Sequence, residues 1–576
     1  MLPALLAVLA AAPNLTTQAE RSGFTETGRF DEVQALCAAF PKAFPGKVKC
    51  EPFGTTPLGR PMLVFVASAD GTFTPEAAQK KSRPVLFLQG GIHAGEIDGK
   101  DAGLWLLRDV LEGKVLPNVL AKVTLVFVPV FNVDGHERFG PNNRPNQNGP
   151  KEMGWRVTSH NLNLNRDYAK ADAPEMQAML KLLHKWDPIL LADLHVTDGA
   201  KFQHDVSVTF EPSNIGPDGL RSLGSSLRVS LFAELEAKGH LPVNFYPSFT
   251  KEDDPASGFA YGWPPPRFGN AYWAANNRYG VLVETHSWKD SKTRVTTTYD
   301  VCLALLRLTS EDGARWLKAA KEADTSEAKK AGSEIVMMWE PKKTGRPIEF
   351  KGYAYTREPS TVSGQPWVRY DDTKPEVWTV PYLDELEPGL TVKAPGAGWV
   401  VPVPHATWVA ERLALHGVSF TVLKDEKRVA ADVYRLVAPK FRAVPYEGRL
   451  TVIARDGVWS QRTIVLPKGS LFIPAAQSRL FLAMHLLDPT SPDSFLAWGF
   501  FNAHLEQKEY LEDYLTEAYA RELLADPKVK AEFEARLKDE AFAKSPEARL
   551  QFFSARHPSA DPMLNVLPVY RVEKAP

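Results

Sequence analysis

A histidine and a glutamate stand three residues apart in the segment LQGGIHAGEIDGK, directly after an apolar run that ends in two glycines. On a tight turn or a first helical turn, positions i and i+3 project to the same side, so the side chains of His93 and Glu96 can meet one ion. An imidazole and a carboxylate suit Zn²⁺, and a catalytic zinc site needs three protein ligands and one open position. Because His-x-x-Glu alone is usually a surface coincidence, a third ligand is required.

Two further candidates stand where apolar runs end. His195 closes the run ILLADLH, and Glu284 closes the run VLVE. In α/β proteins, ligand sites gather at the carboxyl ends of the strands. A lone histidine there would be a core residue more often than a ligand, but three strand ends with suitable side chains make coincidence hard to sustain. We therefore predict one zinc ion held by His93, Glu96 and His195, with Glu284 beside it.

Arginines lie between the candidate ligands. An arginine beside an asparagine, as in Asn165–Arg166, can bind a carboxylate through a bidentate fork. A second arginine near the zinc can polarise a carbonyl and stabilise the developing oxyanion, and Arg156 is the candidate for this role. Without the histidines, the same residues would be interpreted as a capping asparagine and a surface arginine.

The elements that must position these residues alternate between strands and helices. Short apolar runs predict strands covered on both faces, and they are Val85–Leu88, Val123–Phe131, Ile189–Leu194 and Val281–Val283. Helical spacing marks Lys100–Leu111 and Pro174–Leu183, and a helix around Tyr299–Leu308 closes the pattern. This alternation predicts an α/β sandwich with a largely parallel sheet.

The remainder of the chain has a different character. Residues 331–475 contain β-like runs such as Ile348–Tyr355 and one helix at Thr407–Leu415, whereas residues 476–576 are mainly helical. A 3.6-residue apolar period over residues 501–519 predicts an amphipathic helix. A chain of 576 residues is expected to form two to four domains, and residues 331–576 are predicted to be an α+β accessory region.

Composition narrows the class of protein. Lys and Arg number 68 against 69 Asp and Glu, and this balance argues against a nucleic-acid binder. No internal apolar run reaches the roughly 18 to 20 residues that cross a bilayer. Three cysteines exclude a zinc module built on four thiolates.

The first twelve residues have features of a signal peptide. The apolar run LPALLAVLAAA ends in an A-x-A-like site, although no Lys or Arg precedes it, and the alternative is a first helix or a frayed end. We predict an exported protein, periplasmic or secreted. Export would allow Cys37 and Cys50 to pair, whereas Cys302 is expected to be a core residue.

Taken in order, these residues resemble the zinc carboxypeptidases of the M14 type, the group that includes pancreatic carboxypeptidase A. The family pattern is H-x-x-E, an N-R pair, a distant histidine and a catalytic glutamate at a strand end. Two further segments, Asn132–Gly135 and Gly154–Arg156, resemble the family's N-P-D-G turn and the segment that carries its oxyanion arginine. The resemblance covers about residues 30–320. It implies a three-layer α/β/α sandwich with a mixed sheet over residues 20–330.

The resemblance also implies hydrolysis of C-terminal peptide bonds with one Zn²⁺ per chain. The three ligands would hold the ion, which lowers the pKa of its water. Glu284 would take the proton of that water as general base and pass it to the leaving amine. Arg156 would stabilise the oxyanion, and Asn165 and Arg166 would bind the terminal carboxylate.

The chain departs from the family at two points. Asn163 stands where many relatives carry an aspartate that orients the first zinc histidine, and an amide oxygen can still accept that N–H with less effect on ligand basicity. The tyrosine that closes over substrate is expected at Tyr261, in the Gly- and Pro-rich segment DPASGFAYGWPPP, which suits a mobile lid. Tyr246 and Tyr272 are the rival candidates.

Several substrates and one non-enzymatic role remain open. The segment Asp193–Thr197 resembles the D-x-H-x-T of aspartoacylase and succinylglutamate desuccinylase, so a zinc amidase or deacylase is the alternative. Within the carboxypeptidase interpretation, the substrate is a peptide or a peptidoglycan stem peptide. A peptide- or sugar-binding protein with an inactive catalytic domain is a further class. No nucleic acid and no membrane span are expected, and the oligomeric state stays open.

Overall fold

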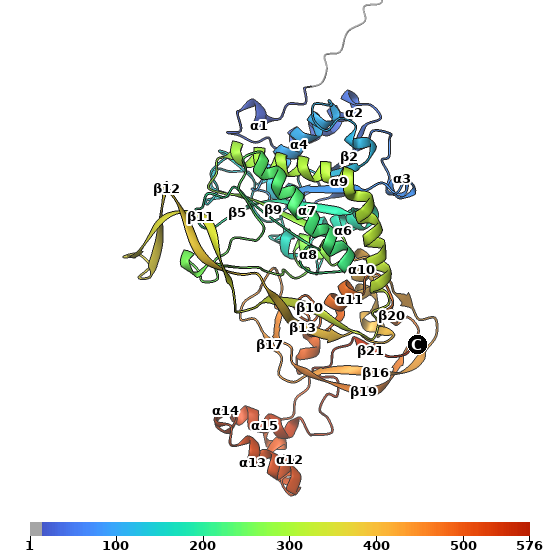
Figure 1. Cartoon of the computed structure of the whole chain (residues 1–576). Helices are drawn as coiled ribbons and strands as arrows, with labels where there is room; N and C mark the ends of the chain where they lie inside the picture. The colour runs from blue at the N-terminus through green and yellow to red at the C-terminus, as the bar shows by residue number, and fades with distance from the viewer. Residues whose placement is uncertain (1–13) are drawn as a thin grey trace, which may run out of the picture.

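The computed structural model describes residues 14–576, so the predicted signal peptide at residues 1–12 lies outside the described residues. A mixed eight-stranded sheet crosses the upper half of the molecule (Figure 1). Its strand order is β1-β2-β4-β3-β5-β9-β6-β7, and β4, β3, β5 and β9 run parallel at its centre. The strands are β1 (Val48–Thr55), β2 (Pro61–Ala67), β3 (Val85–Gly90), β4 (Thr124–Val128), β5 (Leu190–Thr197), β6 (Val206–Glu211), β7 (Pro242–Val243) and β9 (Tyr279–His286).

Helices cover both faces of this sheet, which is why its central strands are apolar throughout. All residues of β3 are buried, and Phe87 packs into one hydrophobic core while Leu86 and Leu88 pack into another. The predicted three-layer sandwich is therefore confirmed. One face is covered by α4 (Asp98–Leu111), α7 (Asp218–Ala237) and α9 (Ser291–Glu327), and the other by α6 (Pro174–Trp186) and α8 (Gly269–Ala274).

The sequence pattern underestimates the length of the last helix of the sandwich. The predicted helix around Tyr299–Leu308 is the middle of α9, which runs for 37 residues. Its buried positions continue through Trp316, Ala320 and Ala323, where small and aromatic residues alternate with charged ones. Most charged side chains of this half face solvent, although Glu327 is buried, and their number makes the apolar period hard to recognise in the sequence.

The region after residue 330 contributes strands to two larger sheets and to two two-stranded ones. In the first, β11 (Arg346–Pro359) and β12 (Pro366–Leu383) form a long hairpin that projects to the left in Figure 1, and β12 also pairs with β8 (Phe259–Ala260). Nearby, β10 (Glu334–Pro341) pairs with β13 (Leu386–Lys393). The second is a six-stranded sheet in the order β15-β20-β14-β21-β16-β19. Its strands are β14 (Gly398–Val401), β15 (Thr421–Val422), β16 (Lys427–Leu436), β19 (Gly457–Leu466), β20 (Leu471–Pro474) and β21 (Tyr570–Val572).

The end of the chain returns to this second sheet. Strand β21 pairs with β14 and with β16, so residues on both sides of the predicted boundary at 475 build one sheet. Helices α10 (Val403–Leu415) and α11 (Leu480–Leu487) pack beside it. One hydrophobic core contains Phe87 of β3, Trp399 of β14 and Leu413 of α10. The region 331–576 is thus packed against the sandwich through a continuous apolar interior.

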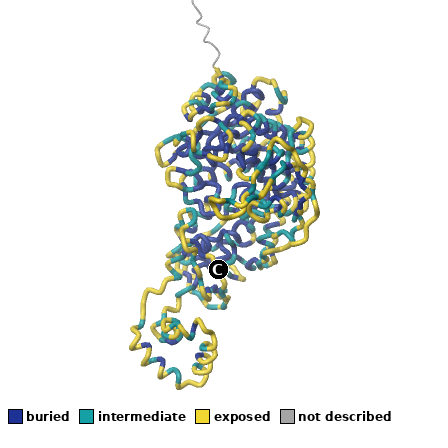
Figure 2. The backbone as a smooth tube through the Cα atoms, turned by 90° about the vertical axis from the view of Figure 1, so that its left-hand side faces the viewer, coloured by how far each residue is buried: buried dark blue, intermediate teal, exposed yellow. Residues whose placement is uncertain are grey.

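A small helical cluster projects from the bottom of the molecule (Figures 1 and 2). It has its own core of Ala520, Phe533, Phe542 and Phe553. The predicted amphipathic helix over residues 501–519 was wrong in its extent, because Phe501 is buried in the main core while Leu515 is 44% exposed. The helices are α12 (Asp513–Leu523), α13 (Pro527–Arg536), α14 (Glu540–Lys544) and α15 (Pro546–Ser554).

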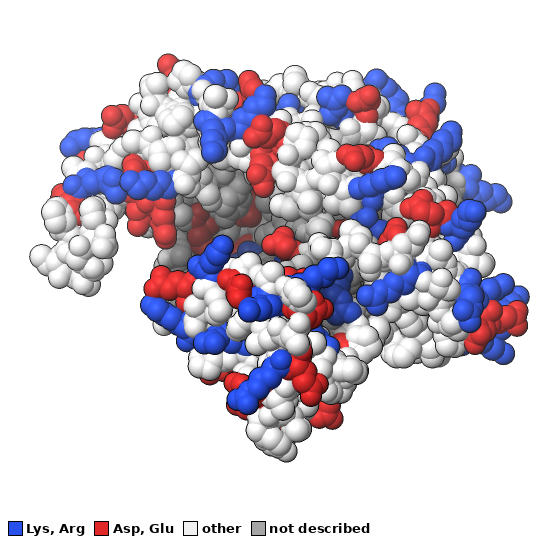
Figure 3. Space-filling view, turned by 90° about the horizontal axis from the view of Figure 1, so that it is seen from below, with Lys and Arg blue, Asp and Glu red and all other residues white. Residues whose placement is uncertain are grey.

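The structure can be compared with the sequence predictions about the cysteines, about membrane-spanning helices and about surface charge. Cys37 in α2 (Phe30–Ala43) forms a disulfide with Cys50 in β1, and Cys302 is a buried free thiol in α9. Within residues 14–576, the helices are too short or too polar to cross a membrane. On the face shown in Figure 3, basic and acidic side chains are interspersed, as the balanced charge predicts.

Candidate metal centre and substrate cavity

The first two predicted ligands lie in the turn that joins β3 to α4. Gly90 permits this turn, because a Cβ there would lie 2.6 Å from the carbonyl oxygen of Pro129. Gly91 adopts a φ of +63°, in the left-handed region that favours glycine. The turn brings His93 and Glu96 to the carboxyl end of the parallel strands, where both side chains are buried.

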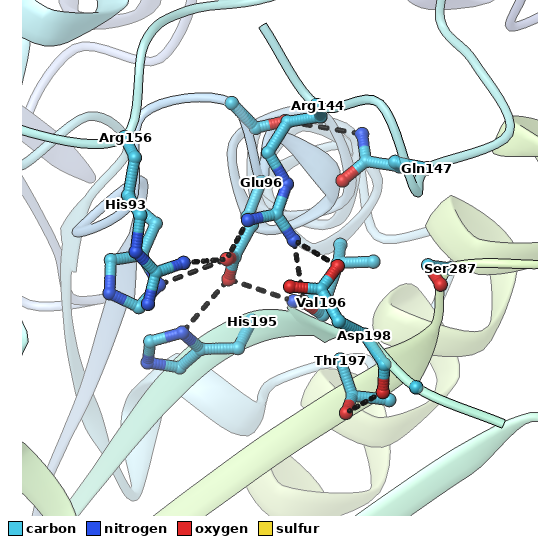
Figure 4. Close-up of polar contacts among 12 residues, drawn as sticks. His93, Glu96, Arg144, Gln147, Arg156, His195, Val196, Thr197, Asp198 and Ser287 are labelled. Carbon is cyan, nitrogen blue, oxygen red and sulfur yellow. Dashed lines mark hydrogen bonds and ion pairs between the residues drawn. The ribbon is translucent and has the colours of Figure 1, made fainter. Parts of the chain in front are cut away.

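The three predicted ligands converge on one point (Figure 4). His93 Nδ1 lies 2.9 Å from Glu96 Oε1, and His195 Nδ1 lies 2.9 Å from Glu96 Oε2. One ligand atom from each residue lies within 4.8 Å of the others, and this is the one such group of three or more residues in the part of the chain that the structure describes. Two imidazoles and a carboxylate match the donor set of a catalytic zinc site.

The outer nitrogens of both histidines face oxygen atoms. His93 Nε2 lies 3.1 Å from Asn163 Oδ1, as expected for the amide that replaces the family's aspartate. His195 Nε2 lies 3.0 Å from Asp193 Oδ2. The Asn163 oxygen keeps a proton on Nε2 of His93 and leaves its Nδ1 lone pair directed at the centre, while the Asp193 carboxylate faces His195 as a charge partner. The residues therefore fit a zinc ion held through both Nδ1 atoms and the Glu96 carboxylate.

The sequence analysis named Asp193 only within the D-x-H-x-T segment and gave it no role beside His195, although a signal was present. Asp193 precedes His195 by two residues on β5, and positions i and i+2 of a strand face the same side. Burial lowers the pKa of His195, but the carboxylates of Asp193 and Glu284 outweigh it and raise the pKa well above its ordinary value. This excess of negative charge around the histidine favours a bound cation.

Two arginines contact Glu96, and only one of them was predicted. Arg156 Nη1 donates a hydrogen bond to Glu96 Oε1 over 3.3 Å, and its side chain remains 36% exposed. Arg144 Nη1 lies 3.0 Å from the same oxygen, while its Nη2 donates to Val196 O and Asp198 Oδ1 (Figure 4). Arg144 is 6% exposed, so it holds Glu96 in place, whereas Arg156 is accessible to substrate. Arg144 lies in the irregular segment NNRPNQNG, which carries no sequence pattern.

Glu284 lies beside the metal ligands on the neighbouring strand. The register of β5 and β9 pairs His195 with Glu284. Burial raises the pKa of Glu284, and the Glu96 and Asp193 carboxylates add to this shift, while His195 opposes it. A buried carboxyl group with a raised pKa can both take up and release a proton near neutral pH, as a general base and acid must.

A cavity of about 440 Å³ opens beside these groups. Its lining includes the rival tyrosine Tyr246 and six of the predicted site residues: His93, Arg156, Asn165, Arg166, Tyr261 and Glu284. Its other walls are largely apolar and include Trp263, Pro264, Phe268 and Leu282. A mainly apolar cavity with a few converging polar groups is the usual form of a small-ligand site.

The Asn165–Arg166 pair is held by neighbouring backbone and by an aromatic ring. The backbone N–H of Asn165 donates to Asn163 Oδ1 over 3.0 Å, and Asn165 Oδ1 accepts from the N–H of Gly269 over 3.2 Å. The guanidinium carbon of Arg166 lies 4.3 Å from the ring centroid of Phe268. Among residues 14–576, no carboxylate lies within 4 Å of the Arg166 guanidinium.

The tyrosine candidates have three different environments. Tyr261 is 7% exposed and donates its hydroxyl hydrogen to Glu211, while its backbone N–H donates to Leu383 O. Tyr272 is fully buried and is excluded from the cavity wall. Tyr246 is 42% exposed, and burial of its hydroxyl together with the nearby Glu284 raises its pKa. Tyr261 is thus part of a fixed wall, its predicted lid role stays untested, and Tyr246 is the tyrosine nearer the reacting groups.

Comparison with known proteins finds similarity to carboxypeptidases. Residues 33–215 match the family described as Zinc carboxypeptidase. Carboxypeptidase A4 of Mus musculus is 29% identical over 124 residues, which span 20% of this chain and 28% of that protein. Carboxypeptidase 2 of Trichophyton rubrum is 22% identical over 466 residues, 77% of this chain and 78% of that protein. A solved structure of carboxypeptidase A from Helicoverpa armigera has a TM-score of 0.36 at 15% identity, covering 52% of this chain and 75% of that one.

The fold is an α/β sandwich, and its site is a His-Glu-His cluster that fits a metal ion. Residues 33–215 are similar to the zinc carboxypeptidase family, and the three predicted ligands His93, Glu96 and His195 all lie within this part of the chain. The aligned segment spans less than a third of the length of carboxypeptidase A4.

Proposed function

We propose that this protein is a zinc-dependent carboxypeptidase that hydrolyses the last peptide bond of a chain with a free carboxyl end. One observation carries the proposal: the cavity that exposes His93 and Glu284 also contains the Arg166 guanidinium, which has no carboxylate partner within 4 Å in the described part of the chain. Arg166 is half-buried, and a guanidinium in a cavity without a counter-ion favours a ligand that supplies negative charge. The carboxylate at the end of a peptide would supply this negative charge beside Arg166.

Each polar residue of the cavity has a separate role in hydrolysis. Asn165 and Arg166 bind the terminal carboxylate and so orient the last peptide bond. A bound Zn²⁺ would supply Lewis-acid activation of water and of the scissile carbonyl. Glu284 takes a proton from the attacking water and passes it to the leaving amine as the C–N bond breaks. Arg156 donates N–H groups to the carbonyl oxygen as negative charge develops on it.

The deacylase alternative uses the same ion but another substrate. Such enzymes act on small N-acyl amino acids, and the cavity would then hold the whole molecule. A peptide substrate extends out of the cavity past Arg156, which is partly exposed. Peptidoglycan stem peptides also end in a free carboxylate, so they are a subset of the proposed substrates.

The test uses the full-length protein with bound zinc. Hydrolysis of a blocked dipeptide is compared with hydrolysis of the same dipeptide amidated at its carboxyl end, with and without a chelator. We expect chelator-sensitive release of the terminal amino acid and a strong preference for the free acid. Turnover of an N-acyl amino acid with no turnover of either dipeptide would instead support the deacylase.

We further propose that the protein acts after export. The Cys37–Cys50 disulfide supports this proposal, because such bonds persist in oxidising compartments and are rare in the cytosol. Thiol labelling of protein recovered from intact cells checks it: only the Cys302 thiol should react after unfolding without reductant. Three reactive thiols in freshly recovered protein would contradict it.

A further inference from the structure

Three consecutive residues connect the C-terminal region to the predicted carboxylate-binding pair. Arg267 and Phe268 directly precede helix α8, and Gly269 is the first residue of that helix. The Phe268 ring lies under the Arg166 guanidinium, and the Gly269 N–H donates to Asn165 Oδ1. The position of this tripeptide, which we name the 267–269 segment, therefore sets the position of both binding side chains.

Asp493 of the C-terminal region holds the first residue of the segment. Its carboxylate is fully buried, accepts the backbone N–H of Arg267 over 2.8 Å, and lies 2.7 Å from Arg267 Nε. Arg267 Nη2 also donates to Pro492 O over 3.0 Å, and its guanidinium lies over the ring of Trp498. Asp493 thus makes a hydrogen bond to the backbone and an ion pair to the side chain of the same residue, and together these contacts fix the chain at Arg267.

The same region also holds the far side of the segment. The Tyr272 hydroxyl in α8 lies 3.0 Å from His416 Nδ1, and Arg479 Nη1 donates to Asn276 O just after that helix. The opposite wall is held as well, since the N–H of Asn163 donates to Glu447 Oε2 over 3.3 Å. Glu447 and His416 of the C-terminal region thus contact the two segments that carry the Asn165–Arg166 pair and its neighbours.

We propose that Asp493 is a positioning residue for recognition of the terminal carboxylate, acting through Arg267 and the 267–269 segment on Asn165 and Arg166. Residues 331–576 are then part of the specificity machinery of the enzyme. This inference rests on the proposed carboxypeptidase function. A displacement of about 1 Å in a binding group can lower catalytic efficiency by about 100-fold. Loss of the Asp493 contact should therefore weaken substrate binding.

The experiment compares Asp493→Asn with the wild-type full-length protein on a blocked dipeptide and its amide. We expect KM for the free acid to rise by about 10- to 100-fold, with kcat within about threefold. Turnover of the amide should hardly change, because no carboxylate is present to be positioned. The preference for the free acid over the amide should therefore fall as KM for the acid rises. The zinc content should stay the same.

Asp488→Asn is the matched control. Asp488 is also a buried aspartate of the C-terminal region, and it pairs with Arg571 rather than with the sandwich. This variant should lose thermal stability comparably and keep the wild-type preference for the free acid. Arg267→Lys is a milder second variant, since it retains a cation beside Asp493 and should lose part of the same preference.

The outcomes separate the inference from the function on which it rests. In an Arg166→Ala background, Asp493→Asn should add little further effect, because both act on one interaction. A wild-type preference that survives unchanged in Asp493→Asn would overturn the inference alone and leave Asp493 a purely structural residue. A wild-type enzyme with no preference for the free acid would overturn the proposed function and this inference together.

Discussion

The amide oxygen of Asn163 lies 3.1 Å from Nε2 of the metal-binding His93, and the same oxygen accepts the backbone N–H of Asn165 over 3.0 Å. One side chain therefore orients the first zinc histidine and the residue that is proposed to bind the substrate carboxylate. An amide accepts the imidazole N–H without the full negative charge of a carboxylate, so it orients the ring while raising its basicity less.

Asn163→Asp should therefore tighten zinc binding, and Asn163→Ala should weaken it. Loss of an outer contact to a metal-binding histidine typically lowers metal affinity by about 10- to 100-fold. Competition of each variant with a chromogenic chelator measures the change. Asn502→Ala is the control, because the Asn502 side chain donates its hydrogen bond to Leu450 O within the C-terminal region. Equal zinc affinity in Asn163→Ala and in the control would mean that the contact does not act on the metal.

Glu284→Gln should retain zinc and fold but lose catalysis. The substitution preserves shape while removing the group that accepts the proton, and the loss of general base and electrostatic effects corresponds to about three orders of magnitude or more in kcat. Zinc content and thermal unfolding serve as the controls within the same sample. Nearly normal kcat in a zinc-loaded variant would show that another group takes the proton.

Much of this site was predictable because each ligand stands at the end of an apolar strand. His93, Glu96, His195 and Glu284 follow runs whose burial is encoded locally, and parallel strands bring their carboxyl ends together. Arg144 was not predictable, since it reaches Glu96 from a loop without periodicity. The loop conformation depends on contacts that are distant in sequence.

The role of the C-terminal region also could not be predicted from the sequence. Asp493 and Arg267 are 226 residues apart, and a pair of charges at that separation has no local signature. The predicted domain limits at 330 and 475 followed changes in composition. The structure shows that the hydrophobic core and the six-stranded sheet cross them.

Truncation after residue 330 should accordingly destroy the folded protein. It would expose the face of the core that Trp399 and Leu413 cover, and each fully buried large apolar side chain contributes about 1.5 to 3 kcal/mol. We expect residues 14–330 alone to be aggregated or to lack a cooperative thermal transition. Deletion of only the projecting helical cluster, residues 513–554, is the control and should leave unfolding cooperative. A soluble and active 14–330 fragment would contradict the shared core.

The stability of the sandwich should depend on pH through His240. Its imidazole lies 2.8 Å from Asp205 and 3.0 Å from Asp300, and hydrogen bonds to these carboxylates raise its pKa from 6.5 to about 9. A raised folded-state pKa means that this contribution is fully present below about pH 6.5 and is lost as pH rises through about 9. The difference in free energy of unfolding between wild type and His240→Gln should therefore shrink across that window.

Urea unfolding at a series of pH values measures this dependence. His557→Gln is a suitable control, because His557 has no carboxylate within 4 Å in residues 14–576 and bonds instead to Ser559. The control should differ from wild type by the same amount at every pH. A His240→Gln difference that stays constant from pH 6 to pH 9.5 would show that the imidazole is not charged in the folded protein.

Carboxylate recognition by Arg166 is the prediction that decides the class of enzyme. Removing one partner of a largely desolvated guanidinium–carboxylate pair typically costs about 3 to 5 kcal/mol, because the other charge is left without compensation. Arg166→Ala, or amidation of the substrate, should each lower kcat/KM by about 10² to 10⁴. The two changes together should lower it little further than either alone, since both remove one interaction.

A nearby arginine provides the control for this double change. Arg138 lies over the ring of Trp155 and is not part of the cavity wall, so Arg138→Ala should keep the preference for the free acid. Steady-state kinetics of the three proteins on the acid and its amide give the full cycle. If Arg166→Ala lowers turnover of acid and amide equally, the guanidinium does not bind the carboxylate, and an amidase or endopeptidase on the same metal becomes the better assignment.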